Sequence, residues 1–278
     1  MNSIGFPNLN IGPFEINPTA ISIGSFRIQW YGIIIVVGMV LACAYAYFRL
    51  KGQGFVLDDV LNIAIICIPS GIVGARLYYV IAEFESYNSI AEVFAIWEGG
   101  LAIYGGIIGG FLGVVGVCMY KKYKLMCLLD SIAPGVMLGQ VIGRWGNFMN
   151  AEAYGNPALP YEFLGFTADM SKGAGEHLFI MSINDMLVYP TFLYESVWNI
   201  IGFIVINLLW KKRKFDGQIA VMYLTWYGLG RSIIEGFRED TLRMGNIRVS
   251  QLLATLCFVV GVCVLIAVPL IIKKKKER

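Results

Sequence analysis

The sequence predicts an all-α polytopic membrane protein with seven transmembrane helices, and three observations support this fold class. Of its 278 residues, 57% are hydrophobic and 15% are charged, and the mean hydropathy is +0.66. Soluble domains have about 45–50% apolar and about 25% charged residues, so this composition excludes a soluble globular enzyme. The apolar residues form long runs, and the basic residues gather at the ends of these runs.

Seven apolar runs are long enough to cross a bilayer, which takes roughly 20 residues in a helix. They lie near residues 30–48, 60–82, 100–120, 128–148, 191–210, 217–235 and 250–272. Gly105, Gly109 and Gly113 are spaced by one helical turn in the third run, which predicts close packing against another helix. We expect residues 1–278 to form a single integral membrane domain without a signal peptide.

The basic residues predict the orientation in the membrane. Clusters of two, three, four and five Lys or Arg residues follow the first, third, fifth and seventh runs, which makes 14 of the 22 in the chain. They lie at residues 49–51, 121–124, 211–214 and 273–278. Seven spans put all four clusters on one side, and the positive-inside rule makes that side cytoplasmic. We therefore expect an outside amino terminus, a cytoplasmic carboxyl terminus, and residues 151–190 as an external insertion.

Polar side chains in and beside the apolar runs fall near the outer ends of the spans in this topology. They are Tyr31, Arg76, Tyr104, Gln140, Arg144, Asn147, Asn150, Glu152, Tyr189, Tyr194, Glu195, Arg231, Glu235 and Arg238. A charge inside a span costs about 2.5–3.5 kcal/mol on insertion scales, so charged residues there are usually functional. The shared depth predicts one polar site that opens toward the outer surface.

Two of the runs place polar residues on a single helical face, spaced by four and then three residues. They are Gln140, Arg144 and Asn147 in the fourth run, and Arg231, Glu235 and Arg238 at the end of the sixth. Guanidinium groups bind phosphate through paired hydrogen bonds and stay charged. Two such faces at headgroup depth predict an anionic phosphate ligand, for which a phospholipid is the natural candidate.

Simpler interpretations exist for several charged residues. Arg231 and Glu235 are equally well explained as a pair that neutralises itself within the bundle. Three further arginines are expected to be interfacial anchors with apolar stems in the bilayer, namely Arg27, Arg243 and Arg248. His177, in the external insertion, is expected to be a surface residue. Because it is the single histidine and the six cysteines form no CxxC pair, the sequence predicts no zinc site.

A specific motif begins within the fourth run and extends beyond it, where residues 143–155 read GRWGNFMNAEAYG. This segment resembles the signature of the bacterial prolipoprotein diacylglyceryl transferases at Gly143, Arg144, Gly146, Asn147, Phe148, Asn150 and Glu152. Five other segments resemble motifs of the same family in the same order, at residues 30–32, 74–77, 99–106, 189–195 and 231–238. The resemblance covers approximately residues 20–272. The family's seven spans and outside amino terminus agree with the topology inferred above.

The resemblance implies the first step of bacterial lipoprotein maturation, in the cytoplasmic membrane. The diacylglyceryl group of phosphatidylglycerol would pass to the lipobox cysteine thiol in the signal peptide of a prolipoprotein. The products would be a thioether and glycerol phosphate. The partners would be these two substrates and the lipid bilayer, with no nucleic acid, metal or soluble cofactor.

Roles for individual residues follow as hypotheses. The expected catalytic residues are Arg144, Asn147, Glu152, Arg238, Tyr31 and Tyr104. The expected substrate-binding residues are Arg144, Arg76, Arg231, Glu235, Asn150 and Gly155. The arginines at 144 and 238, with the one at 76, would hold the headgroup phosphate. Asn147 and Tyr31 would orient the headgroup, and Glu152 would bind the glycerol hydroxyls or order Arg144.

Two positions depart from the family pattern. Tyr104 and Tyr189 stand where proteobacterial members often have histidine, so an imidazole base at position 104 cannot operate in this chain. A phenol with a pKa near ~10 is a poor resting base, whereas positive surroundings by themselves favour a thiolate. We therefore expect the cationic site to activate the thiol.

Two other classes of protein compete with the enzyme. Intramembrane arginines and glycine-rich spans would suit an anion transporter or channel, but such sites usually lie at the midplane between internal repeats. The sequence shows no repeat, and its polar residues lie at the span ends. The second alternative is a membrane scaffold that binds a partner through residues 151–190, but it would not explain why Arg, Asn and Glu residues cluster at the span ends.

Overall fold

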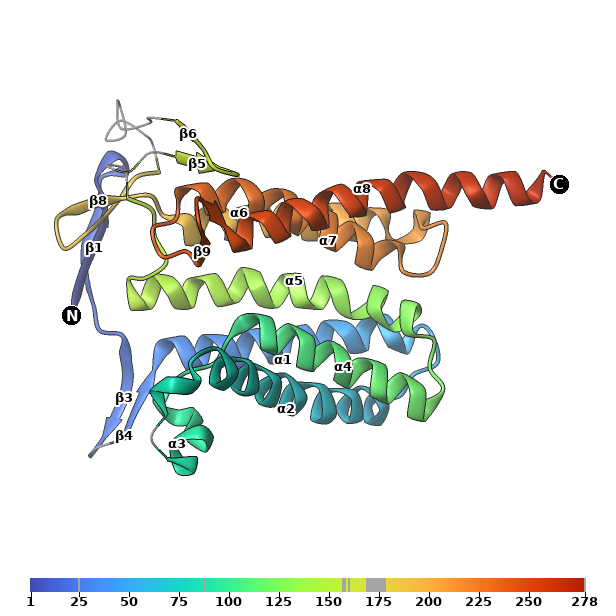
Figure 1. The fold of residues 1–278 in the computed structure, drawn as a ribbon, viewed down its shortest axis with the longest axis horizontal. Coiled ribbons are helices and arrows are strands. Elements are labelled where there is room, and N and C mark those ends of the chain that lie inside the picture. The colour runs from blue at the N-terminus through green and yellow to red at the C-terminus, as the bar shows by residue number, and fades with distance from the viewer. Residues whose placement is uncertain (25, 88, 157–158, 160, 169–178, 278) are drawn as a thin grey trace. The chain divides into compact units, whose positions relative to one another are not determined.

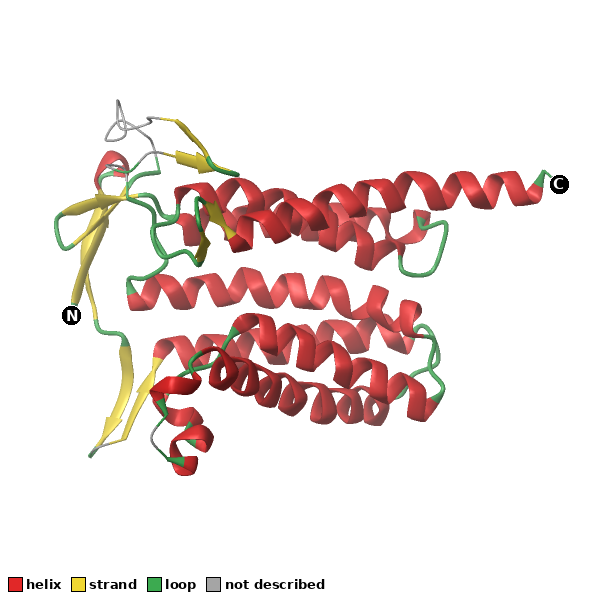
Figure 2. Cartoon of the chain, viewed as in Figure 1, coloured by secondary structure: helices red, strands yellow, loops and turns green. Residues whose placement is uncertain are grey.

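Helices make up most of the residues that the structure describes, as the ribbon views show (Figure 1, Figure 2). The computed structural model describes residues 1–277 except 25, 88, 157–158, 160 and 169–178. The α-helices are α1 (Trp30–Lys51), α2 (Leu57–Ala82), α3 (Ile90–Phe94), α4 (Ile103–Lys121), α5 (Leu125–Asn150), α6 (Thr191–Leu209), α7 (Gln218–Ile234) and α8 (Val249–Lys276). Short 3-10 helices include η1 (Pro7–Leu9), η2 (Phe84–Ser86), η3 (Ile96–Glu98), η5 (Trp210–Lys212) and η6 (Glu235–Phe237).

Six helical segments in the described part of the chain are long and apolar enough to cross a membrane, which makes the chain a polytopic membrane protein. They are α1, α2, α4, α5, α6 extended through η5, and α8. The sixth predicted span forms α7, which has 17 residues. At 1.5 Å per residue its length is about 25 Å, less than the roughly 30 Å of a hydrocarbon core.

The prediction of an all-α protein is wrong outside the long helices, where the described residues form ten short strands (Figure 2). They are β1 (Asn2–Phe6), β2 (Ile11–Ile16), β3 (Thr19–Ile23), β4 (Phe26–Gln29), β5 (Tyr161–Phe163), β6 (Phe166–Ala168), β7 (Met181–Ile183), β8 (Met186–Val188), β9 (Arg243–Met244) and β10 (Ile247–Arg248). The longest has six residues. Alternation over so few positions does not stand out in a sequence this apolar.

One four-stranded sheet joins the amino-terminal segment to the insertion at residues 151–190. Its strand order is β2-β1-β7-β8, and Ile4 of β1 lies opposite Ile183 of β7. Both side chains are buried in a cluster that includes Phe192 of α6. The sheet therefore packs on the first turn of α6, the helix that also carries Glu195. His177 lies outside the described residues.

The chain divides into two compact units, and the boundaries fall within α1 and α5. The first consists of Met1–Ala44 and Ile132–Arg278, and the second of Tyr45–Ser131. In the second unit α2 packs on α4 through glycines, as the spacing in the third run predicts. A Cβ atom at Gly105 or Gly109 would overlap backbone atoms of Gly74 or Ser70 on α2. The small residues thus let the two backbones touch.

A reciprocal contact of two indoles joins α6 to α7. Trp198 and Trp226 stack with their ring centroids 4.7 Å apart, and each indole N–H donates to the other residue's carbonyl at 2.9 Å. The rings lie over Gly230 and Gly202, where a Cβ atom would overlap them. These interactions hold the two helices that carry Glu195 and Arg231.

Candidate active site

The buried carboxylate of Glu195 on α6 contacts the arginines of the two polar helical faces that the sequence predicts. Its side chain is 4% exposed and lies 2.7 Å from Arg144 of α5 and 2.6 Å from Arg231 of α7. Arg238, which directly follows η6, is 3.8 Å away. The structure thus confirms that the fourth and sixth runs bring their guanidinium groups to one place.

Charge within this cluster does not balance. Arg231 also pairs with Glu235, whose side chain is 1% exposed, so the simple Arg231–Glu235 pair is one part of a larger network. Three arginines face two buried glutamates, which leaves one net positive charge. Asp240 accepts two hydrogen bonds from Arg238, at 2.9 and 3.1 Å, but its carboxylate lies outside the buried cluster, with its side chain 55% exposed. The buried cluster therefore favours an additional single negative charge.

A hydrogen-bonded chain extends from Arg144 along the end of α5. The guanidinium donates to Asn147 Oδ1 at 3.3 Å, and the Asn147 amide donates to Glu152 Oε1 at 3.0 Å. Asn150 donates to the same Glu152 oxygen at 3.4 Å. The family-like motif therefore forms a continuous network, in which Asn147 links the exposed Glu152 to Arg144.

Tyr31 and Gly155 border this network through close backbone approaches. The Tyr31 ring lies against Gly146 of α5, where a Cβ atom would overlap the ring. Gly155 exchanges two backbone hydrogen bonds with Tyr189, at 3.0 and 2.7 Å, and forms a bridge with Arg238. A Cβ atom at Gly155 would overlap the Phe237 carbonyl. The need for glycine at this position thus follows from packing, and its contact with substrate stays a prediction.

Arg76 and Tyr104 belong to the second unit, Tyr45–Ser131. The Arg76 guanidinium donates to four backbone carbonyls between residues 92 and 100, at 2.6 to 3.0 Å. It therefore organises the segment before α4 in this structure, and its role in phosphate binding stays a prediction. Tyr104 lies in the first turn of α4, with its ring centroid 6.4 Å from that of Tyr78.

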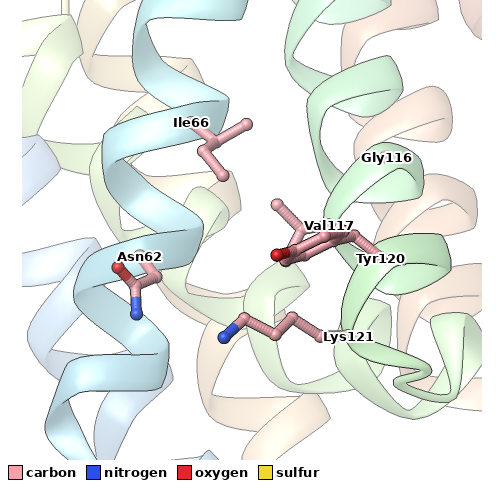
Figure 3. A pocket seen from close by; sticks show the side chains of 6 residues that line it. All are labelled: Asn62, Ile66, Gly116, Val117, Tyr120 and Lys121. Carbon is pink, nitrogen blue, oxygen red and sulfur yellow. The ribbon is translucent and has the colours of Figure 1, made fainter.

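The second unit also contains a groove between α2 and α4, with a volume of about 300 Å³ (Figure 3). Six residues line it: Asn62, Ile66, Gly116, Val117, Tyr120 and Lys121. None of the predicted site residues is among them.

The sequence did not reveal the roles of two residues, one at the centre of the cluster and one beside it. Glu195 was noted at the start of a span but given no role, although a carboxylate within an apolar run is itself a functional signal. Arg248 was expected to be an interfacial anchor, which is wrong because its side chain is 4% exposed and pairs with Glu162 at 3.1 Å. Its partner lies 86 residues earlier, so no local pattern could reveal the pair. Arg243 binds the same carboxylate at 2.9 Å and is 43% exposed.

Comparison with known proteins identifies the family. Residues 18–267 match the family model described as prolipoprotein diacylglyceryl transferase. Three bacterial relatives are named phosphatidylglycerol–prolipoprotein diacylglyceryl transferase. The Streptococcus uberis protein is 44% identical over 252 residues, which cover 89% of this chain and 93% of the relative. The Streptococcus mutans protein is 43% identical, and the match covers 90% of this chain and 95% of the relative. The Clostridium botulinum protein (strain Loch Maree) is 42% identical, and the match covers 94% of this chain and 100% of the relative. The resemblance in the motifs is thereby confirmed, and the chain belongs to the prolipoprotein diacylglyceryl transferase family.

Proposed function

We propose that this chain transfers the diacylglyceryl group of phosphatidylglycerol to the lipobox cysteine thiol in the signal peptide of a prolipoprotein. A carbon–sulfur bond forms at the glycerol carbon that carries the phosphate, and the carbon–oxygen bond to that phosphate breaks. Glycerol phosphate leaves with the bonding electrons, and the thiol proton passes to solvent. The family membership supports this transferase chemistry and leaves the transporter and scaffold alternatives without support.

The observation that carries the proposal is the net positive charge of the buried cluster. Three arginines and two glutamates leave one positive charge inside the buried cluster, which the exposed Asp240 contacts from outside, and the phosphodiester of phosphatidylglycerol carries one negative charge. Two unit charges 4 Å apart attract by about 4 kcal/mol at an effective dielectric constant near 20. The site is thus matched in charge to a monoanionic headgroup.

Different residues of the site serve substrate binding, catalysis and the positioning of other side chains. Arg144 is the most exposed of the three cluster arginines, at 21%, so it is the guanidinium best placed to meet the phosphate. Arg238 is the second donor, and Arg231 with Glu235 holds Glu195 and the other arginines in place. Asn147 and Tyr31 orient the headgroup, while Asn150 and Gly155 border it. Glu152 binds the glycerol hydroxyls or orders Arg144.

Rate enhancement comes from contacts that strengthen as negative charge builds on the departing phosphate oxygen. The same positive charge favours the thiolate of the incoming cysteine, a few per cent of which is ionised at neutral pH. Tyr104 is expected to touch the thiol without acting as its resting base. No imidazole base is needed in this scheme.

A seven-span topology with the amino terminus outside supports access for both substrates. At one end of the α6–α7 pair Glu195 contacts Arg231, and beyond the middle of the helices Ile206 and Ile219 are buried together with Met137. Because α7 runs back along most of α6, the packing of this pair supports a crossing by α7 beside a membrane-spanning α6. Residues 151–190 then form an external insertion of a single integral membrane domain, in a bacterial cytoplasmic membrane.

The test is a reconstituted reaction with the full chain in phosphatidylglycerol vesicles and a lipobox peptide. We expect the peptide mass to increase by one diacylglyceryl group, and a peptide with Ser in place of the lipobox Cys to stay unmodified. Arg144→Ala and Asn147→Ala should abolish transfer in folded protein. Absence of product with the unchanged chain would contradict the function, and full activity of Arg144→Ala would contradict the phosphate-binding role.

A further inference from the structure

Arg248 ties the backbone of the candidate active site to a hairpin of the insertion. It is the last residue of β10 and the N-cap of α8, and its guanidinium is almost fully buried. One nitrogen, Nη1, donates to the carbonyls of Glu235 and Arg238, the latter at 2.7 Å. The first carbonyl belongs to the first residue of η6, and the second belongs to the residue that follows η6. The side chains of these same two residues, Glu235 and Arg238, belong to the cluster around Glu195.

The charge of this buried guanidinium is compensated by the hairpin β5–β6. Arg248 Nε donates to Glu162 of β5 at 3.1 Å. One turn further along α8, Gln251 is fully buried, donates to the carbonyls of Ser232 and Glu162, and accepts from the Leu164 amide. The first turn of α8 therefore holds the end of α7 with one set of bonds and the hairpin with another.

We infer that Arg248 is a positioning residue for Arg238, and that through it the hairpin β5–β6 is coupled to the candidate active site. This inference rests on the proposed function for its effect on transfer. Arg248 has no contact with Glu195 or Arg144 among the described interactions, so it acts through the backbone of residues 235–238. Without its two donated bonds, the turn loses the contacts that fix the approach of Arg238 to Glu195.

Arg243 provides a matched control because it binds the same Glu162 carboxylate but donates to none of the carbonyls of the turn in the described contacts. We expect Arg248→Gln to lower kcat/KM for phosphatidylglycerol about 10- to 100-fold, as displaced catalytic groups do. Arg243→Gln should stay within about twofold, since a pair this exposed contributes little. Equal losses in the two variants would overturn the inference.

A double variant separates positioning from general destabilisation. If Arg248 acts through Arg238, then Arg238→Gln together with Arg248→Gln should be no less active than Arg238→Gln alone. Losses that multiply would overturn the inference. Should Arg248→Gln fail to fold, Arg248→Lys permits the same comparisons, because it keeps the charge beside Glu162 but lacks the planar fork.

Hydrogen–deuterium exchange tests the coupling without turnover. Arg248→Gln should accelerate amide exchange at residues 235–240 and in β5–β6, whereas Arg243→Gln should leave residues 235–240 unchanged. Unchanged exchange at the turn in Arg248→Gln would overturn the coupling. The proposed function fails separately from this inference. If the two variants show the expected exchange differences but the unchanged chain forms no lipidated peptide, the coupling stands and the proposed function is contradicted.

Discussion

Glu195 is the residue on which most of the cluster's charge interactions depend. Its two carboxylate oxygens meet guanidinium groups from α5, from α7 and from the segment after η6, so one side chain fixes the relative positions of three arginines. Breaking a buried ion pair costs about 3–5 kcal/mol, because the remaining charges stay buried without compensation.

Glu195→Gln should therefore damage both folding and transfer. The substitution leaves three arginines against the single buried carboxylate of Glu235, and we expect a lower melting temperature and a transfer rate reduced about 100-fold or more. Asp240→Asn is the control, because Asp240 also contacts Arg238 but is mostly exposed. The measurements are a melting curve in detergent and the peptide lipidation assay. Equal effects of the two substitutions would contradict the central role of Glu195.

Tyr104→Phe tests whether the thiol needs a phenol. Because the cationic cluster by itself favours a thiolate, we expect the variant to retain part of its transfer activity. The measurement is complementation of a transferase-depleted bacterium, with the lipoprotein mass as readout. A folded but inactive Tyr104→Phe protein would show that the hydroxyl is required.

At the scale of elements, the hairpin β5–β6 is attached to α8 and the β9–β10 hairpin by charge. Burial alone would raise the pKa of the Glu162 carboxyl, but hydrogen bonds from Arg243 and Arg248 and their positive charges together bring it below its usual value. A carboxyl whose pKa is lower in the folded than in the unfolded protein stabilises the fold. This stabilisation is complete at a pH above the pKa in the unfolded protein, about 4.3, and it is lost as the pH falls through the pKa in the folded protein.

Acid should therefore loosen this attachment. We expect the melting temperature of the unchanged chain to exceed that of Glu162→Gln at pH 7, and the difference to shrink as the pH falls from about 4.3 toward 3. Glu277→Gln, at an exposed carboxylate, is the control and should match the unchanged chain throughout. A difference that is constant over this pH range would show that Glu162 stabilises the fold by some means other than its charge.

Packing of α2 on α4 gives a second test at this scale. At Gly109 an added methyl group would overlap backbone atoms of α2, while at Gly116 of the same helix it would enter open space. We expect Gly109→Ala to destabilise the protein by about 1–3 kcal/mol through overpacking. Gly116→Ala should be neutral or slightly stabilising, because alanine favours the helix. Melting curves in detergent compare the two, and equal stability would contradict the close backbone contact.

At the scale of the whole molecule, the number of spans decides on which side each terminus lies. With α7 as a span, alkaline phosphatase fused after Lys214 should be inactive in the cytoplasm, and phosphatase fused after Asp240 should be active outside. A fusion at the carboxyl terminus should again be inactive. Equal activity after Lys214 and Asp240 would show that α7 does not cross, and the seven-span topology would fail.

Much of the fold was predictable because the bilayer imposes a length and a polarity on each helix. The runs of apolar residues mark α1, α2 and α4 to α8, and the spacing of Arg144, Asn147 and Glu152 marks a network that is local in sequence. The ion pairs of Glu195 and Arg248 join residues 36 to 86 positions apart, as in the Glu195–Arg231 and Glu162–Arg248 pairs. Such pairs depend on how the elements pack, which a single sequence does not reveal.

The stacked indoles of Trp198 and Trp226 have a practical consequence. Two chromophores at 4.7 Å whose ring planes are inclined by 25° couple their electronic transitions in a skewed arrangement, so the pair should give an exciton signal in circular dichroism. Because one indole comes from α6 and the other from α7, this signal reports optically, and without any label, whether the helices that bear Glu195 and Arg231 remain together while lipid and peptide bind.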